Sequence, residues 1–131
     1  MKKVGINELV AEVVAQLKEY NKVCQGDVKK AVIDTAKECV KEIKLKSPSK
    51  TGDYRSGWRR RTMFENADEI RINVYNTKKP QLTHLLEFGH IVRNRPGGRV
   101  LGNAGAHPHI RPAEIKAQKE LVKRIEKAVK G

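Results

Sequence analysis

The chain has 131 residues, with 28 Lys and Arg against 15 Asp and Glu, which gives a formal net charge of +13. This length suits a single domain over residues 1–131. No apolar run approaches the ~18 residues that cross a membrane, and the first residues lack the apolar stretch of a signal peptide. Two cysteines are too few for a disulfide framework. We therefore expect no membrane contact and a reduced, cytosolic environment.

The first third of the chain carries a helical pattern. Apolar residues recur at steps of three or four from Ile6 to Ile43, which predicts a long helix over about residues 6–46. Gly26 permits either one helix or two collinear pieces. Both cysteines, Cys24 and Cys39, fall on the apolar stripe, so we expect buried thiols. The helix must end before the proline at position 48, because the residue preceding a proline is disfavoured in helical conformation.

Two strand-like segments follow, and they predict an antiparallel hairpin over residues 56–64 and 69–76. Alternation along the first strand places Trp58 and Phe64 toward the core. The same alternation places Arg60 on that face. Its side chain must therefore reach back to solvent, be moved by a bulge, or find a carboxylate.

The rest of the chain alternates between short elements and loops. Residues 81–88 fit two helical turns, and Gly89 suits the end of that helix. The glycine-rich stretch from 90 to 105 predicts a long basic loop or a flexible pair of short strands. Together these elements form a hairpin and loop region over about 55–111. Pro112 opens a final helix over about 112–130 as its first residue.

Arginine is concentrated in the middle of the chain. Nine of the ten arginines lie between residues 47 and 111, and Glu87 is the only acid between Glu69 and Glu114. Because arginine holds phosphate or carboxylate with a rigid fork, this region favours a polyanion or an acidic partner over a plain solvated surface. The residues expected at an interface, or facing DNA, are Arg59, Arg61, Arg93, Arg95 and Arg99.

Glu87 lies between two apolar residues, and an unpaired buried carboxylate is costly. We expect it to form a structural ion pair with Arg60, the arginine expected on the core face of its strand. Arg55 and Arg111 are the alternative donors. The other possibility is a solvated Glu87 with no partner.

The sequence predicts no enzyme, no metal site and no cofactor. Paired carboxylates, a nucleophile with a nearby base, and a phosphate-binding loop are all missing from the pattern. Two weak metal-ligand sets are His84 with Glu87 and His109, and His90 with Asn103 and His107. The first set matches no metalloprotease spacing, and the second lacks the carboxylates that a metal nuclease needs.

Three motifs in order carry a resemblance to a known family. They are Ser47-Pro48-x-x-Thr51-Gly52-x-Tyr54-Arg55-x-Gly57-Trp58, then Leu85-Leu86-Glu87-Phe88-Gly89-His90, then His107-Pro108-x-Ile110-Arg111-Pro112-Ala113. Over residues 8–130 the chain resembles small morphogenesis proteins of long-tailed phages, called minor tail, tail-completion or head–tail joining proteins. His109 departs from the large apolar residue that this family has at its position.

The resemblance implies an α+β fold, with an antiparallel sheet of about three to four strands packed by the long N-terminal helix and the C-terminal helix. It implies a structural protein at the head–tail junction or tail end that acts as a ring subunit. The implied partners are further copies of the chain and neighbouring connector and tail proteins, in the virion neck or tail and, during assembly, in the host cytoplasm. The alternative function is a basic module that contacts DNA phosphate non-specifically.

Overall fold

The computed structural model describes residues 11–18, 22–48 and 52–130. Its elements in chain order are β1 (Ala11–Gln16), α1 (Lys22–Lys46), α2 (Asp53–Ser56), β2 (Trp58–Glu65), β3 (Glu69–Asn76), α3 (Leu82–Phe88), β4 (His90–Arg93), β5 (Val100–Ala104) and α4 (Ile110–Lys130). The expected α+β fold is confirmed. None of the helices in these ranges is long and apolar enough to cross a membrane.

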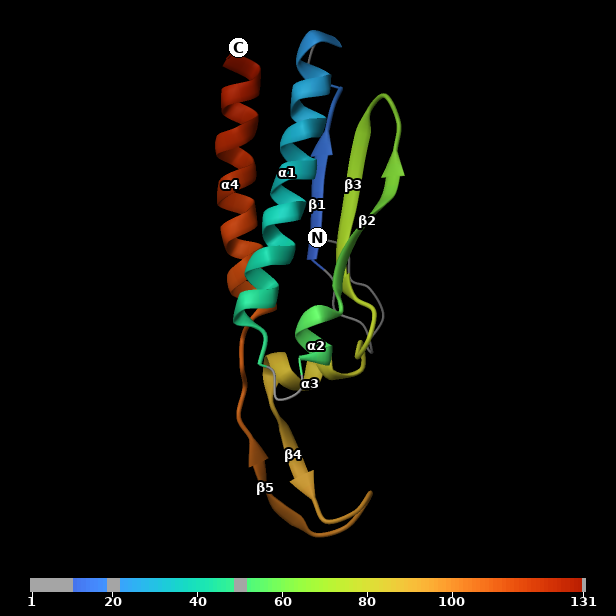
Figure 1. Ribbon diagram of the computed structural model, residues 1–131, viewed down its shortest axis with the longest axis vertical. Helices are drawn as coiled ribbons and strands as arrows, with labels where there is room; N and C mark the ends of the chain where they lie inside the picture. Colours follow the sequence, from blue (N-terminus) through green and yellow to red (C-terminus); the bar gives the residue numbers. More distant parts are fainter. Residues whose placement is uncertain (1–10, 19–21, 49–51, 131) are drawn as a thin grey trace.

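The body of the molecule is an antiparallel sheet in the order β1-β3-β2, with α1 and α4 packed beside it (Figure 1). The separate β4–β5 hairpin projects from one end of this body, and the short helices α2 and α3 lie between the two (Figure 1). The molecule is therefore elongated. The helices α1 and α4 and the strands of the main sheet run along its long axis, and the β4–β5 hairpin lies at one end (Figure 1).

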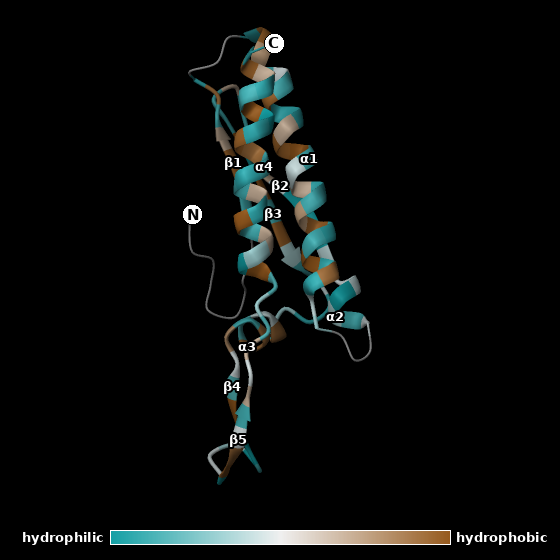
Figure 2. Ribbon diagram, turned by 90° about the vertical axis from the view of Figure 1, so that its left-hand side faces the viewer, coloured by the Kyte–Doolittle hydropathy of each residue, from teal (hydrophilic) through white to brown (hydrophobic). Residues whose placement is uncertain are grey.

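The core lies between the central strand β3 and helix α1. Ile70, Ile72 and Val74 of β3 are at most 1% exposed, and Val28 and Val32 of α1 are fully buried. Each large side chain buried in this way contributes roughly 1.5–3 kcal/mol to stability. Hydrophilic and hydrophobic residues alternate along both α1 and α4 (Figure 2).

The predicted helix over 6–46 is wrong in its first part, where residues 11–16 form β1 instead. In this segment Val13, Ala15 and Leu17 are buried in alternation, and β1 pairs with β3 along its whole length. Apolar residues at steps of four fit a strand as well as a helix, and the β-branched valines favour the strand. The part of the prediction before β1 lies outside the described residues.

The predicted hairpin is confirmed as β2 and β3, with one error on β2. Trp58 is fully buried, but Phe64 is 48% exposed. A bulge between Thr62 and Phe64 shifts the register, so that Phe64 pairs with Arg71 on the sheet face turned away from α1. Arg60 lies before the bulge and is exposed.

The two ends of the β4–β5 hairpin meet at Gly89, directly after α3. Gly89 has a φ of 77°, and a Cβ there would lie 2.6 Å from the carbonyl oxygen of Ala104. Only glycine fits this close approach without strain. The stretch from 90 to 105 thus takes the second of its two expected forms, a pair of short strands. Helix α4 begins two residues before Pro112, which occupies its first turn.

Candidate functional site

The second and third sequence motifs meet at the carboxylate of Glu87, which is 5% exposed. Its Oε1 accepts hydrogen bonds from the backbone N–H groups of His109 (2.8 Å) and Ile110 (2.9 Å), and its Oε2 accepts one from Arg111 (3.0 Å). These are the first N–H groups of α4, which lack partners within the helix, and Pro112 has no N–H to satisfy. A carboxylate also complements the positive end of the helix dipole. Glu87 therefore caps α4 from another helix.

The expected ion pair between Glu87 and Arg60 is wrong. Among the described residues, Arg60 makes no ion pair with Glu87 and is exposed on β2. Of the two alternatives, Arg111 contributes its backbone N–H, and the guanidinium of Arg55 donates to the carbonyl of Ser47 (2.9 Å). A helix N-terminus thus takes the place of the expected cation, because three N–H groups and a partial positive charge can neutralise a buried carboxylate.

His109 lies beside this cap and is fully buried. Its Nδ1 is 2.7 Å from the carbonyl oxygen of His107 and 3.1 Å from Oε1 of Glu87. Because both neighbours are acceptors, we assign the proton to Nδ1. The Nε2 atom then accepts a hydrogen bond from the hydroxyl of Tyr54 at 2.6 Å. Burial lowers the pKa of His109, so the ring is neutral at pH 7.

The first motif closes the cluster through two aromatic side chains. Tyr54 and Trp58 each contact the ring of His109 edge-on, with centroids 5.4 and 6.1 Å away. The indole of Trp58 donates to the hydroxyl of Ser47 (2.9 Å). Burial raises the pKa of Tyr54, and the charge of Glu87 raises it further. The three motifs therefore form one buried cluster that joins α2, α3 and the start of α4.

This cluster has a row of titratable groups, Tyr54, His109 and Glu87, but no access for a substrate. The three residues are 5%, 0% and 5% exposed. Each polar atom in the row is occupied by a partner within the cluster. The row therefore fixes the geometry between helices and does not present a reactive group.

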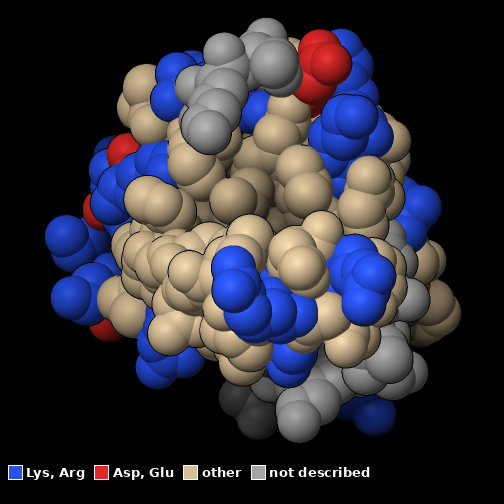
Figure 3. All heavy atoms as spheres, turned by 90° about the horizontal axis from the view of Figure 1, so that it is seen from below, with Lys and Arg blue, Asp and Glu red and all other residues tan. Residues whose placement is uncertain are grey.

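The β4–β5 hairpin, by contrast, is exposed almost throughout. Its apolar side chains are 37–56% exposed, and Phe88 at its base is 62% exposed. The exposed apolar residues of the two strands are Ile91, Val92, Val100 and Leu101. The predicted residues Arg93, Arg95 and Arg99 lie on the same hairpin and are exposed. Seen from this end of the molecule, the exposed charge is mainly Lys and Arg (Figure 3).

The other two predicted arginines lie on β2, in the body of the molecule. Arg61 is exposed, and its guanidinium stacks 4.3 Å from the ring centroid of Tyr75. Arg59 is exposed and donates to the carbonyls of Ser56 (2.7 Å) and Trp58 (2.8 Å). The structure does not gather the five predicted arginines into one site, because two belong to the sheet and three to the projecting hairpin.

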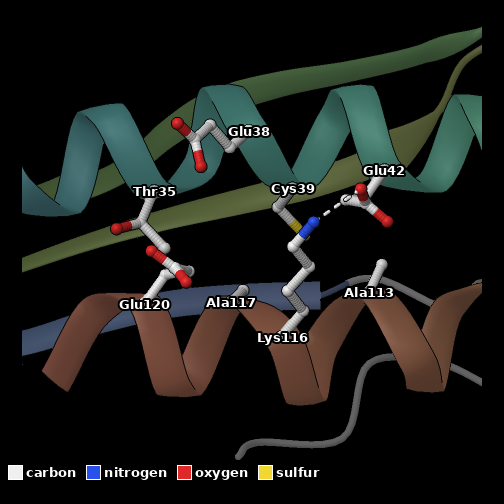
Figure 4. A pocket seen from close by; sticks show the side chains of 8 residues that line it. All are labelled: Thr35, Glu38, Cys39, Glu42, Ala113, Lys116, Ala117 and Glu120. Atoms are coloured by element: carbon white, nitrogen blue, oxygen red, sulfur yellow. Dashed lines mark hydrogen bonds and ion pairs between the residues drawn. The ribbon is translucent and has the colours of Figure 1, made fainter. Parts of the chain in front are cut away.

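A small cavity lies between α1 and α4, and its lining residues are engaged in contacts between the two helices (Figure 4). Lys116 of α4 reaches across it to Glu42 of α1 at 2.8 Å (Figure 4). This hydrogen bond lowers the pKa of Glu42. Burial raises the pKa of the Cys39 thiol to about 12, so the sulfur stays protonated and unreactive at neutral pH. The cavity is a packing feature between two helices joined by ion pairs.

The set of His84, Glu87 and His109 does not form a metal site. The described ranges hold no group of three or more His, Cys, Asp or Glu placed to bind a metal ion. His109 and Glu87 belong to the buried cluster, and the ring of His84 packs against Phe88 with centroids 4.9 Å apart.

Comparison with known proteins adds one finding. A family model described as "Bacteriophage HK97-gp10, putative tail-component" matches residues 11–89, which is more than half of the chain. The match begins at β1 and ends at Gly89, directly after α3. No curated protein and no solved structure matches the chain. The chain therefore belongs to the HK97-gp10-like family of phage tail components, in agreement with the resemblance of its motifs.

Proposed function

We propose that this phage tail component is a ring subunit at the head–tail junction or tail end, and that it acts through protein–protein contacts and not as an enzyme. Membership of the family supports a structural role in the virion. The observation that carries the finer proposal is the β4–β5 hairpin, which projects from the body (Figure 1) and has exposed apolar side chains.

A hairpin of two short strands is marginally stable in water when nothing covers it. This one forms its own two-stranded sheet, separate from the sheet of the body. Contiguous exposed apolar side chains mark interaction sites, and each Å² of apolar surface that a neighbour covers contributes about 25 cal/mol. The hairpin is therefore suited to contact another protein in the assembled state.

A second apolar surface lies on α4. Ile115, Val122 and Val129 are 41%, 56% and 44% exposed. Their spacing of seven residues places them on one helix face, since seven residues are close to two full turns. A ring of identical subunits joins two different surfaces of each copy. The hairpin and this face of α4 are two such surfaces, and connector and tail proteins are the proposed neighbours above and below the ring.

The test is charge reversal on the hairpin, with Arg93, Arg95 and Arg99 all replaced by Glu. These side chains are exposed, so the fold should persist, as judged by circular dichroism. We expect full heads and complete tails that fail to join when the variant replaces the natural protein in a phage assembly assay.

The matched control replaces three lysines outside the hairpin and α4, Lys18, Lys22 and Lys30, by Glu. These three are also exposed, and the change in net charge is the same. Joining should proceed with this control. Normal joining with the hairpin variant, or equal failure with both variants, would contradict the proposed role of the hairpin.

A further inference from the structure

An open groove between α1 and β2 is lined by five basic side chains and no acid. The five are Lys37, Lys41 and Lys44 of α1 with Arg59 and Arg60 of β2. Val40 and the buried Trp58 are the other two lining residues. The steps of four and three residues place the lysines on one face of α1. The groove therefore gathers positive charge from two elements that are distant in sequence.

The charges of α1 are sorted between its two sides. Two of its acids pair with bases of α4, Glu42 with Lys116 (2.8 Å) and Glu38 with Arg124 (2.7 Å), whereas the three lysines line the groove beside β2. Within the described residues, none of the five bases of the groove has an ion-pair partner. Their charge is thus available to an anion from outside the chain.

A second copy of this chain is not a suitable anion for the groove. Each copy carries a net charge of +13, so two copies repel each other. Glu38 and Glu42 of α1 are already paired with α4. The anion must come from another kind of molecule.

The composition of the groove favours nucleic acid over an acidic protein. Protein–protein interfaces have an apolar centre and are depleted in Lys, whereas protein–DNA interfaces are polar and strongly basic. Here the apolar lining is limited to Val40 and the buried Trp58, and no exposed aromatic is present for base stacking. Lys37 and Lys44 are seven residues apart, about 10 Å along the helix, which is the rise of about three phosphates on one DNA strand.

We propose that the α1–β2 groove binds the phosphate backbone of double-stranded DNA without regard to sequence. This inference does not depend on ring formation, because the groove is complete within one subunit. Failure of the ring proposal would leave it intact, and its own failure would leave the ring proposal intact.

The test is a titration of the dilute full-length protein with a 24-base-pair duplex at several salt concentrations, using two unrelated sequences. Neutralising up to five phosphates gives a slope of log affinity against log salt of up to about −4.5. The triple variant Lys37→Gln, Lys41→Gln and Lys44→Gln keeps a polar side chain at each position, with a shorter aliphatic stem, and removes three charges. We expect it to bind at least about tenfold more weakly at low salt and to lower the size of the slope by about 2.7.

The control variant carries Lys119→Gln, Lys123→Gln and Lys127→Gln on α4, with the same loss of charge. It should retain most of the affinity and the slope, and melting curves of both variants verify the fold. Equal losses in both variants would overturn the proposal, as would a clear preference for one sequence. Binding of polyglutamate as tight as that of the duplex, and equally lost in the groove variant, would also overturn it in favour of an acidic protein partner.

Discussion

Glu87 satisfies the start of α4 with a single side chain. Three backbone N–H groups point at its two oxygens, and the following residue, Pro112, needs no acceptor. The same carboxylate lies 3.1 Å from Nδ1 of His109, so the cap and the aromatic cluster share an atom. Loss of the negative charge therefore affects both the helix start and the contact between α3 and α4.

Replacement of Glu87 by Gln should destabilise the protein by about 2–3 kcal/mol. Hydrogen bonds to a charged acceptor contribute about 1.5–3 kcal/mol, and the amide NH₂ of Gln would face N–H donors. Chemical denaturation measures the free energy of unfolding. Arg60→Ala is the control, because Arg60 is exposed, and its effect should stay within about 0.5 kcal/mol. A large loss in the Arg60 variant with a small loss in the Glu87 variant would contradict this assignment.

The neutral His109 predicts a stability that falls as the pH is lowered. Its pKa in the folded protein lies below the ordinary value of about 6.5. Below pH 6.5 the unfolded chain therefore binds a proton that the folded protein does not, and the free energy of unfolding decreases by at most about 1.4 kcal/mol for each pH unit. Above the ordinary pKa the stabilisation is fully present.

The measurement compares denaturation at pH 7.5 and pH 5.5 in the natural protein and in His109→Phe. The variant keeps an aromatic ring but cannot titrate, so its stability should change less between the two pH values. Burial raises the pKa of Glu114, so this carboxyl increases the free energy of unfolding as the pH is lowered. The effect is present in both proteins and therefore cancels when their pH dependences are compared. An identical pH dependence in both proteins would show that His109 is not the titrating group.

At the residue scale, the sequence indicated that Glu87 needs a partner but not which one. An apolar context shows that a carboxylate must be neutralised, and the partners that a sequence displays for it are cationic side chains. A helix start 22 residues away offers only backbone groups, which carry no residue-specific signal. The family resemblance marks His109 as unusual at its position, but the contacts of its ring with Tyr54 and Trp58 depend on the packing of three distant segments.

At the scale of elements, short-range patterns predict the hairpin, α3 and α4 but not β1. Val13, Ala15 and Leu17 are buried at intervals of two residues, as in a strand. Val13 and Leu17 are also four residues apart, so they fit the helical spacing that continues into α1. Pairing with β3 is what makes this segment a strand, because β1 forms an antiparallel ladder with one edge of β3 over six residues. Such a long-range requirement is invisible in a local window. The register shift at the bulge, which exposes Phe64, is likewise not visible in the local alternation of residues.

The β4–β5 hairpin is the element whose behaviour should change most on assembly. In dilute solution, amide hydrogens over residues 91–105 should exchange much faster than those of α1 and β3, because the hairpin buries few apolar side chains. In assembled particles the same amides should become protected. Hydrogen exchange followed by mass spectrometry measures both states. Strong protection of 91–105 in the dilute monomer would show that the hairpin is stable without a neighbour.

At the scale of the whole molecule, two opposing forces act between copies. The net charge of +13 makes copies repel, while the exposed apolar residues of the hairpin and α4 favour contact. The range of the repulsion depends on salt, since the screening length falls from about 10 Å at 0.1 M to about 3 Å at 1 M. Contacts between apolar surfaces do not weaken in this way. Salt therefore separates association of copies from binding to an anion.

We expect self-association to increase as the salt concentration is raised from 0.1 to 1 M, while binding to DNA decreases over the same range. Light scattering coupled to gel filtration gives the mass of the particles at each salt concentration. The variant Ile91→Ser with Leu101→Ser removes two exposed apolar residues of the hairpin and should remain monomeric at high salt. The matched control, Val23→Ser with Leu45→Ser, removes two residues of α1 that are 85% and 73% exposed, and it should still associate.

Association that weakens with salt would show that opposite charges, and not apolar surfaces, join the copies. Equal loss in both variants would show that the hairpin has no special part in the contact.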